Sequence, residues 1–276
     1  MPDARDWSRD DSARFVRAPG ASDDKYSRGV VGLRTGSSAY PGAAVLGVEA
    51  AWRAGAGFVR YIGEGRAAEG VIARRPETVV SANAEGARVG AWVIGSGTDP
   101  TARTDAEERE LRAILDGEVP VVVDAGALDL AADASAPLLL TPHAREFERL
   151  GDRLGLRSDS DRARAASTMA AALGCTVLLK GAETLIASSD GAVRTVGAGT
   201  GWLATAGTGD VLGGVLGALL AANPEAPVAD VAAAGAWLHG HAARIASETD
   251  GDGAGHPIVA LDVAQALPRA IADLLA

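Results

Sequence analysis

The clearest pattern along the chain is a series of short apolar runs, each followed by glycine or polar residues. Segments with helical character separate most of these runs. Continuous apolar runs between helices are typical of the central strands of a parallel sheet, because both faces of such a sheet are covered. The pattern therefore predicts a layered α/β fold. The predicted strands are Val30–Arg34, Ala91–Ile94, Pro120–Val123, Pro137–Leu140, Val177–Leu179, Thr184–Ala187 and Val193–Val196.

Helices are predicted between these strands and at the end of the chain, where Pro or Gly separates them. Ser189-Asp190-Gly191 predicts a turn between two strands of a hairpin at the edge of the sheet. We find no internal repeat and no linker that divides the core. Residues 25–276 are therefore predicted to form one domain after a flexible tail, residues 1–24. The predicted helices run from Pro41 to about Arg53 and over Asp105–Leu115, Ala144–Leu150, Asp210–Ala222, Val228–Glu248 and Leu261–Leu275.

Composition and charge exclude two classes of protein. The 276 residues include 26 Lys plus Arg and 36 Asp plus Glu, a formal net charge of −10. An acidic chain without a basic cluster argues against nucleic-acid binding. The longest run of small and apolar residues, Val211–Ala222, is 12 residues, whereas a membrane helix needs about 20. Residues 1–19 alternate Asp and Arg without an apolar core, so we expect neither a signal peptide nor an anchor.

Two rare residue types carry further information. The single cysteine, Cys175, has no partner for an internal disulfide and lies in an apolar run, which is typical of a reducing compartment. We therefore expect a cytoplasmic protein. The chain has only two lysines, Lys25 and Lys180, and the second lies at the end of a predicted buried strand.

The candidate chemistry lies directly after the predicted strands. In an open α/β sheet the ligand binds beyond the carboxyl ends of the strands. One polar or glycine-rich segment could be only a tight turn, but six in succession indicate a binding site. These segments are Gly36-Ser37-Ser38, Gly95-Ser96-Gly97, Asp124, Thr141-Pro142-His143 with Glu146, Lys180 to Thr184, and Gly207 to Asp210.

The strongest single signal is Ala206-Gly207-Thr208-Gly209-Asp210, which opens directly into a predicted helix. Glycines let backbone N–H groups point at an anion, and the helix N-terminus adds about half a positive charge. The segment therefore predicts a phosphate site. Asp210 is either the N-cap of this helix or a general base that takes a proton from a substrate hydroxyl beside a transferable phosphate. We predict the second role.

Other common motifs are absent from the sequence, namely the phosphate-binding G-x-x-x-x-G-K-[ST], the dinucleotide-binding G-x-G-x-x-G after a strand and the nucleophile elbow G-x-S-x-G. His239 and His241 lie two apart on a predicted helix and point to different sides, so we expect core or surface histidines rather than a metal pair. His143 follows a buried strand. It is either part of the site or a helix-start histidine that local hydrogen bonds satisfy.

Together these segments resemble the ADP- or ATP-dependent NAD(P)H-hydrate dehydratases. The resemblance spans about Lys25 to the C-terminus and implies a three-layer ribokinase-like fold, a central, mostly parallel sheet flanked by helices. No single block is decisive, but the set is highly specific. The blocks are Lys25 to Gly29, Gly36-Ser37, Tyr40 to Ala44, Arg53 to Gly57, Arg75-Pro76-Glu77, Gly95 to Gly97, Val123 to Leu128, Leu140 to His143, Glu146-Phe147, Leu179 to Ala182 with Thr184, Gly207 to Leu212 and Leu238-His239-Gly240.

The resemblance implies a lyase, a carbon–oxygen hydro-lyase that repairs the S epimer of hydrated NADH and NADPH. ADP or ATP phosphorylates the hydroxyl of the hydrate, and phosphate is then eliminated with a push from the ring nitrogen. Asp210 would be the catalytic base, and Glu146 would help hold Mg²⁺ through water. The hydrate would contact Ala43, Gly97, His143 and Asp210, and the nucleotide would lie along Lys180, Gly181, Ala182, Glu183 and Thr184 and against Gly207, Thr208 and Gly209.

This chain departs from the family pattern at two positions, and the resemblance also implies partner proteins. Many members have a second glycine at the position of Ala206, and Gly-Pro-Gly in place of Gly95-Ser96-Gly97. An epimerase domain is often fused ahead of the dehydratase, and residues 1–24 are too short to encode one. We therefore expect a monofunctional chain that works with a separate NAD(P)H-hydrate epimerase. The apolar helix from Val228 to Ile245 and the habit of the family suggest a homo-oligomer, commonly a tetramer.

Two other functions stay open at this point. The first is a small-molecule kinase of the same fold, acting on a hydroxymethyl group of a pyrimidine or a pyridine such as pyridoxal, although such kinases usually have Thr-Pro-Asn where this chain has Thr141-Pro142-His143. The second is a non-catalytic nucleotide-binding protein, against which Asp210 and Glu146 argue. The sequence leaves open the choices between ADP and ATP and between the hydrates of NADH and NADPH.

Overall fold

The strands form a single sheet. The computed structural model describes residues 4–249 and 253–276. Within these residues the strand order is β1-β10-β9-β8-β7-β6-β5-β2-β3-β4, and all neighbours are parallel except β9, which is antiparallel to both β8 and β10. The strands are β1 (Ala4–Asp6), β2 (Val30–Arg34), β3 (Phe58–Ile62), β4 (Val79–Ser81), β5 (Ala91–Ile94), β6 (Val121–Val123), β7 (Leu138–Leu140), β8 (Thr176–Leu179), β9 (Thr184–Ala187) and β10 (Val193–Val196).

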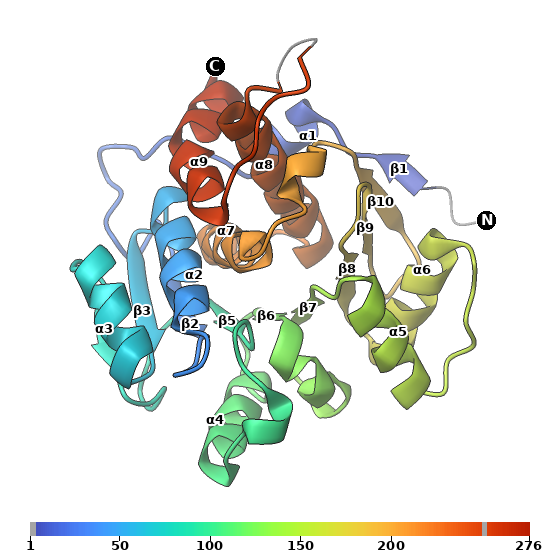
Figure 1. Ribbon diagram of the computed structural model, residues 1–276, viewed down its shortest axis with the longest axis horizontal. Coiled ribbons are helices and arrows are strands. Elements are labelled where there is room, and N and C mark those ends of the chain that lie inside the picture. The colour runs from blue at the N-terminus through green and yellow to red at the C-terminus, as the bar shows by residue number, and fades with distance from the viewer. Residues whose placement is uncertain (1–3, 250–252) are drawn as a thin grey trace.

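Helices cover both faces of the sheet (Figure 1), which confirms the predicted three-layer fold. One layer contains α1, α2, α3, α7, α8 and α9, and the other contains α4, α5 and α6. Strand residues alternate between the two layers: Val122 packs in the first, Val121 and Val123 in the second. The α-helices are α1 (Arg9–Ala13), α2 (Pro41–Arg53), α3 (Gly65–Arg74), α4 (Asp105–Leu115), α5 (Ala144–Arg153), α6 (Arg162–Leu173), α7 (Thr208–Ala222), α8 (Val228–Ser247) and α9 (Ala260–Leu275), with 3₁₀ turns η1 (Pro100–Ala102), η2 (Ala125–Asp133) and η3 (Gly201–Leu203).

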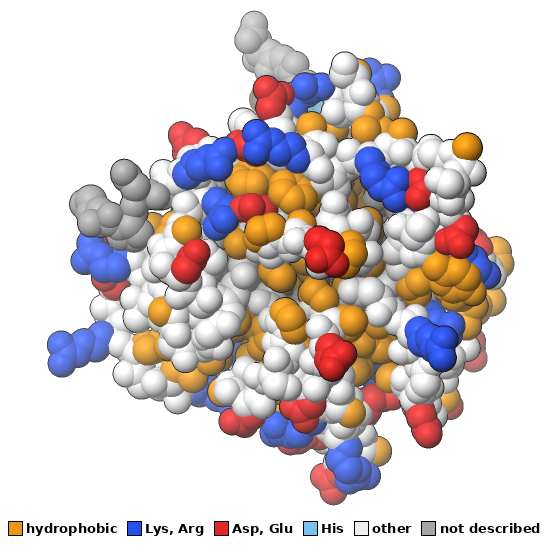
Figure 2. All heavy atoms as spheres, turned by 180° about the vertical axis from the view of Figure 1, so that it is seen from behind, with side chains coloured by type: hydrophobic (Ala, Val, Ile, Leu, Met, Phe, Trp, Pro, Cys, Tyr) orange, Lys and Arg blue, Asp and Glu red, His pale blue; other side chains and the backbone are white. Residues whose placement is uncertain are grey.

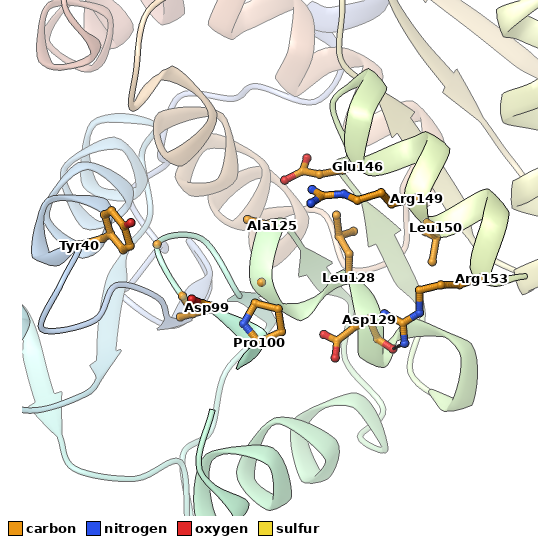
Figure 3. Close-up of a pocket in the computed structure, with 13 residues that line it drawn as sticks. Tyr40, Asp99, Pro100, Ala125, Leu128, Asp129, Glu146, Arg149, Leu150 and Arg153 are labelled. Carbon is orange, nitrogen blue, oxygen red and sulfur yellow. Dashed lines mark hydrogen bonds between the residues drawn. The ribbon is translucent and has the colours of Figure 1, made fainter. Parts of the chain in front are cut away.

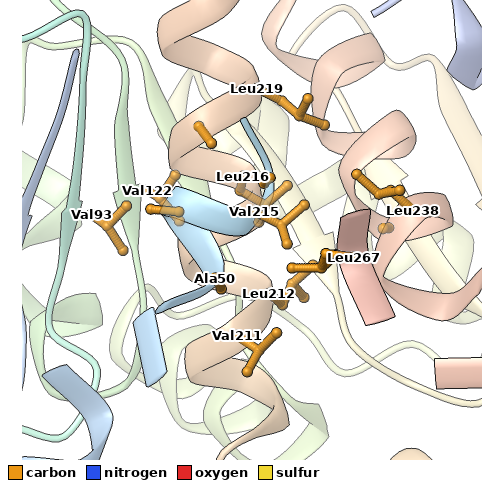
Figure 4. Packing of buried hydrophobic residues seen from close by; sticks show 14 of the residues in the cluster. Ala50, Val93, Val122, Val211, Leu212, Val215, Leu216, Leu219, Leu238 and Leu267 are labelled. Carbon is orange, nitrogen blue, oxygen red and sulfur yellow. The ribbon is translucent and has the colours of Figure 1, made fainter. Parts of the chain in front are cut away.

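Helix α7 is the most deeply buried helix of its layer. Its apolar residues pack on strands β5 and β6, on α2 and on the C-terminal helices (Figure 4). Two glycines permit this close approach. A Cβ atom at Gly214 would lie 2.2 Å from the carbonyl oxygen of Gly47 in α2, and one at Gly217 would lie 2.5 Å from Cγ2 of Val93. Because interiors are packed to crystal-like density, α7 has one position against the sheet, and its N-terminus is fixed with it.

Most predicted elements are confirmed within one or two residues. Strands β6 and β7 each begin one residue after the predicted proline, because proline has no N–H to donate to a neighbouring strand. Helix α5 continues beyond the predicted Leu150 to Arg153. Besides the N-terminal β1 and α1, four strands and α-helices were not predicted: β3, β4, α3 and α6. The central arginine of β3 and the alanine-rich, charged sequence of α6 obscure the hydrophobic pattern on which the predictions rested.

The segment predicted to be a tail carries regular structure. β1 pairs in parallel with β10, so the prediction that the β9–β10 hairpin lies at the sheet edge is wrong. The side chain of Trp7 is only 7% exposed, and its Nε1 donates a hydrogen bond to Oγ of Ser12 at 2.9 Å. Ser8 caps α1, and the carboxylate of Asp11 pairs with Arg5 at 2.6 Å. One buried indole thus anchors a segment whose charge pattern suggested a solvated chain.

The surface mixes both signs of charge. On the face shown in Figure 2, acidic and basic side chains lie interspersed among apolar and small residues. No helix in the described part of the chain has both the length and the apolar character to cross a membrane. Cys175 is buried beneath the surface, and burial raises the pKa of its thiol to about 12.

The anchoring role of Trp7 can be tested by truncating its side chain. Trp7→Ala should lower the free energy of unfolding by about 3–5 kcal/mol, the usual cost of deleting a buried aromatic side chain. Trp7→Phe keeps most of the buried area and loses only the hydrogen bond to Ser12, so it should cost about 1 kcal/mol. Guanidinium unfolding of both variants measures the difference. Equal stability of wild type and Trp7→Ala would show that residues 4–13 do not contribute to the fold.

Candidate active site

A buried carboxylate joins the ends of four neighbouring strands. Asp124 follows β6 and is 4% exposed. It accepts hydrogen bonds from Ser96 Oγ after β5, at 3.0 Å, and from Thr141 Oγ1 after β7, at 2.9 Å. Lys180 Nζ, after β8, lies 2.9 Å from Asp124 Oδ1. A buried charge is costly unless it is paired and hydrogen-bonded, and these three donors satisfy that condition.

Lys180 connects this carboxylate to the beginning of α7. Its ammonium group is also 3.5 Å from the point where a Cβ atom at Gly209 would lie. The structure therefore brings together two of the residues that were predicted to bind the nucleotide, Lys180 and Gly209. The loop after Lys180 extends into solvent, with Gly181, Ala182 and Glu183 exposed. Arg162 of α6 holds it by hydrogen bonds to the carbonyl oxygens of Glu183 and Lys180, at 3.2 and 3.4 Å.

The N-terminus of α7 presents free donors at this position. Gly207 is the N-cap with φ +90°, a conformation that favours glycine, and a Cβ atom there would lie 2.7 Å from Leu46 Cδ1. Thr208 Oγ1 donates to the carbonyl oxygens of Leu203 and Thr205, both at 3.0 Å, and so fixes the preceding loop. The backbone N–H groups of Thr208, Gly209 and Asp210 donate to no group in the described residues. Three free donors at a helix N-terminus form an anion site.

Asp210 lies in the first turn of α7 but is not its N-cap, which is Gly207, so the N-cap alternative is wrong. Its side chain has no hydrogen-bond partner among the described residues. Burial raises the pKa of Asp210 to about 6; the negative charge of Asp124 contributes in the same direction, and the positive charge of Lys180 opposes both. A carboxylate with a pKa this close to neutrality is a better base than an exposed aspartate and is still largely ionised at pH 7.

The two histidines of α8 have separate roles. His239 is 8% exposed, and its buried Nε2 has no hydrogen-bond partner among the described residues. Burial lowers its pKa to about 4, so the imidazole beneath the glycine loop is neutral. His241 instead lies 3.1 Å from Asp273. No group of three or more potential metal-binding side chains is found in the part of the chain that the structure describes.

His143 and Glu146 form the first turn of α5. Nδ1 of His143 accepts a hydrogen bond from the N–H of Glu146 at 3.3 Å, and Oε2 of Glu146 accepts one from the N–H of His143 at 2.9 Å. The alternative of a helix-start histidine with local hydrogen bonds therefore describes its geometry. Half of the His143 side chain remains exposed, so it is also accessible to a ligand.

A cavity opens beside these groups. Ala43 of α2 touches Gly97, where a Cβ atom would lie only 2.4 Å from that of Ala43. Gly97 lines a cavity of about 530 Å³ that runs between the loops after β5 and β6 and helix α5 (Figure 3). Sequence reasoning singled out Gly97 and Glu146 in its wall. It missed Arg149 and Arg153, because the predicted helix ended at Leu150 and so did not place both arginines on one helical face.

Sheet order, helical layers and the glycine turn before α7 together define a ribokinase-like α/β protein. A ribokinase-like superfamily protein of Enterococcus faecalis has the same fold, with a TM-score of 0.82 at 23% identity over 98% of this chain and 96% of that chain. A family model described as NAD(P)H-hydrate dehydratase matches residues 31–265. The chain belongs to the NAD(P)H-hydrate dehydratase family.

Individual relatives agree with this assignment. The bifunctional NAD(P)H-hydrate repair enzyme Nnr of Mycobacterium leprae is 45% identical over 88% of this chain and 51% of its own length. The ADP-dependent (S)-NAD(P)H-hydrate dehydratase of Neisseria meningitidis is 39% identical over 84% of this chain and 81% of its own. The ADP/ATP-dependent NAD(P)H-hydrate dehydratase of Bacillus subtilis, co-crystallised with ATP and Mg²⁺, is 28% identical, with a TM-score of 0.84 over 99% of this chain and 100% of that chain. This chain spans about half the length of the bifunctional relatives.

The raised pKa of Asp210 predicts a stability gain on its removal. The folded state binds the proton more tightly than the unfolded chain, so the proton contributes stability at low pH, and this is lost as the pH rises through about 4 to 6. Asp210→Asn, which stays neutral, should therefore raise the free energy of unfolding at pH 8 by about 1–3 kcal/mol and change it much less at pH 4.

Guanidinium unfolding at the two pH values provides the measurement. Asp105→Asn is the matched control, because Asp105 is an exposed aspartate in the first turn of α4. A stabilisation by Asp210→Asn that is the same at pH 4 and pH 8 would contradict the raised pKa.

Proposed function

We propose that this protein dehydrates the S epimer of hydrated NADH and NADPH and returns the intact cofactors, with ADP or ATP as the phosphoryl donor. The observation that carries the proposal is the position of Asp210. A partly buried carboxylate with a raised pKa lies in the same helical turn as three free N–H donors and beside Lys180. A base next to a phosphate site is what phosphoryl transfer to a hydroxyl requires.

The proposed reaction has two steps. In the first, Asp210 takes the proton of the hydrate's hydroxyl as its oxygen attacks the terminal phosphorus of ADP or ATP. The bond from phosphorus to the leaving oxygen breaks and releases AMP or ADP. In the second, the ring nitrogen's electron pair expels phosphate from the neighbouring carbon, and a proton leaves the adjacent carbon to restore the ring double bond. Hydroxide is a poor leaving group, so the phosphate ester lowers the barrier.

The remaining predicted site residues receive roles that fit their positions. The N–H groups of Thr208 and Gly209, after the turn at Gly207, would bind the transferring phosphate. Lys180 would add a point charge at the same place. The exposed residues Gly181, Ala182 and Glu183, with Thr184, would lie along the rest of the nucleotide. On the other side, Ala43, Gly97 and the accessible His143 would contact the hydrate.

Glu146 is a suitable residue for Mg²⁺ bound through water. Its side chain is only 12% exposed and lines the cavity, and one carboxylate oxygen, Oε1, has no partner in the described residues. Mg²⁺ is usually bound by one or two carboxylates together with substrate phosphates and waters, so the single carboxylate of Glu146 is enough on the side of the protein. When bound, the ion would neutralise charge on the nucleotide phosphates.

The proposal also covers the partner enzyme, the domain organisation, the oligomeric state and the cellular location of the protein. The bifunctional relatives suggest that an NAD(P)H-hydrate epimerase supplies the S epimer. We propose that residues 25–276 form one dehydratase domain to which residues 4–13 add a strand and a helix. A cytoplasmic homo-oligomer, with a tetramer favoured, remains our expectation.

The activity can be tested directly with the hydrated cofactor. Hydrated NADH mixed with the protein, Mg²⁺ and ADP or ATP should regain the near-ultraviolet absorbance of reduced nicotinamide. Asp210→Asn should lower the rate by about 10²–10⁴ while nucleotide binding is kept, because the amides of α7 and Lys180 remain. The assignment would be wrong if the protein left the hydrate untouched and instead formed a stable phosphoester of a hydroxymethylpyrimidine or pyridoxal.

A further inference from the structure

Two arginines on one face of α5 line the cavity and have no acidic partner among the described residues. Arg149 and Arg153 are four residues apart, so their side chains project from the same side of the helix. Both are exposed and line the cavity, and the Arg149 side chain extends from α5 into it (Figure 3). Arg149 has no ion pair or hydrogen bond within the described residues. The single hydrogen bond of Arg153 is to the carbonyl oxygen of Asp129, at 3.4 Å.

The acidic residues of the same wall are already engaged. Arg103 pairs with both carboxylate oxygens of Asp129, at 2.9 and 2.6 Å. Asp99 accepts hydrogen bonds from the N–H and hydroxyl of Thr101, and Glu146 accepts one from the N–H of His143. Apart from Oε1 of Glu146, the carboxylates of this wall therefore have hydrogen-bond partners, whereas the guanidinium groups of Arg149 and Arg153 have no carboxylate partner among the described residues. Such a wall suits an anionic ligand that can offer two oxygens to one guanidinium group, above all a phosphate.

The cavity begins at the catalytic cluster. Gly97 in its wall directly follows Ser96, which donates to Asp124, and Ala125 directly follows Asp124 itself. A ligand whose reacting ring lies near Asp210 would thus extend from the strand ends along α5. None of the residues assigned to contact the nucleotide directly, Lys180 to Thr184 and Gly207 to Gly209, lines this cavity, and Glu146 in its wall would reach the nucleotide only through water and Mg²⁺. It lies on the substrate side of the site.

We propose that Arg149 and Arg153 bind phosphate groups of the hydrated dinucleotide, so that α5 holds the part of the substrate that does not react. This inference rests on the proposed function. Hydrated NADH carries a diphosphate and hydrated NADPH carries a 2′-phosphate as well, and a pair of guanidinium groups can bind either. Substrate recognition then depends on the cavity, and the chemistry on the N-terminus of α7.

Steady-state kinetics of Arg149→Ala and Arg153→Ala test the proposal. Each variant should raise KM for the hydrate about tenfold to a hundredfold, as expected for the loss of a charge-assisted hydrogen bond, with kcat and the KM for ADP little changed. Arg149→Lys should recover part of the loss. Arg109→Ala is the matched control, because Arg109 is an exposed arginine on α4 that does not line the cavity.

A comparison of the two hydrates shows whether the arginines bind the diphosphate or the 2′-phosphate of the substrate. An equal effect on the hydrates of NADH and NADPH would assign the arginines to the diphosphate, and an effect on the NADPH hydrate alone would assign them to the 2′-phosphate. Either result supports the proposal. An unchanged KM for both hydrates, or a raised KM for ADP instead, would overturn it.

A direct measurement of binding tests the role of the arginines without relying on turnover. Titration of the wild type and the arginine variants with NADH and NADPH, followed by their fluorescence, measures affinity without catalysis. A wild-type protein that binds the dinucleotides through these arginines but does not repair the hydrate would refute the proposed function alone. An active wild type whose arginine variants bind and turn over normally would refute only the role of the arginines.

Discussion

The site depends on the ion pair between Asp124 and Lys180. Asp124 is buried at the carboxyl ends of four parallel strands, and its hydrogen bonds to Ser96 and Thr141 fix the neighbouring loops. The pair holds an ammonium group beside Gly209. Breaking a buried pair leaves a charge without compensation, which typically costs about 3–5 kcal/mol. The carboxylate that keeps Lys180 in place also adds to the effect of burial in raising the pKa of Asp210, so one residue contributes to both the structure and the reactivity of the site.

Packing supplies the second constraint. Glycines at 214 and 217 let α7 lie against α2 and β5, which leaves the helix no room to shift. Its free N–H groups are therefore directed at one point beyond the sheet, where Lys180 also lies. Asp124, the ammonium group of Lys180 and the N–H groups of α7 come from separate segments of the chain. They meet because the sheet brings the ends of its parallel strands to one edge. Oriented groups of this kind stabilise developing charge without reorganisation.

Much of this arrangement could be predicted from the sequence. Short apolar runs located the central strands, and the residues after them identified Gly207 to Asp210, Lys180 and Asp124 as candidates. The sequence could not show that Asp124 pairs with Lys180, because the two are 56 positions apart and either could have faced solvent. Strand β1 could not be predicted either, because a single buried residue, Trp7, among charged residues produces no hydrophobic periodicity. Arg149 and Arg153 were missed because free donors are recognised only once the partners of neighbouring acids are known.

The departure from Gly-Pro-Gly at Ser96 has a structural consequence, because its hydroxyl is one of the three donors to Asp124. The central claim is that Asp210 is the catalytic base and that the charge of Asp124 adds to the effect of burial in raising its pKa, and the pH dependence of kcat tests it most directly. The wild type should lose activity on the acidic side near pH 6. In Asp124→Asn this limb should move to lower pH, because the carboxylate that opposes ionisation is gone, whereas Ser96→Ala, which keeps the charge, should shift it far less. An acidic limb that stays in place in Asp124→Asn would contradict the account.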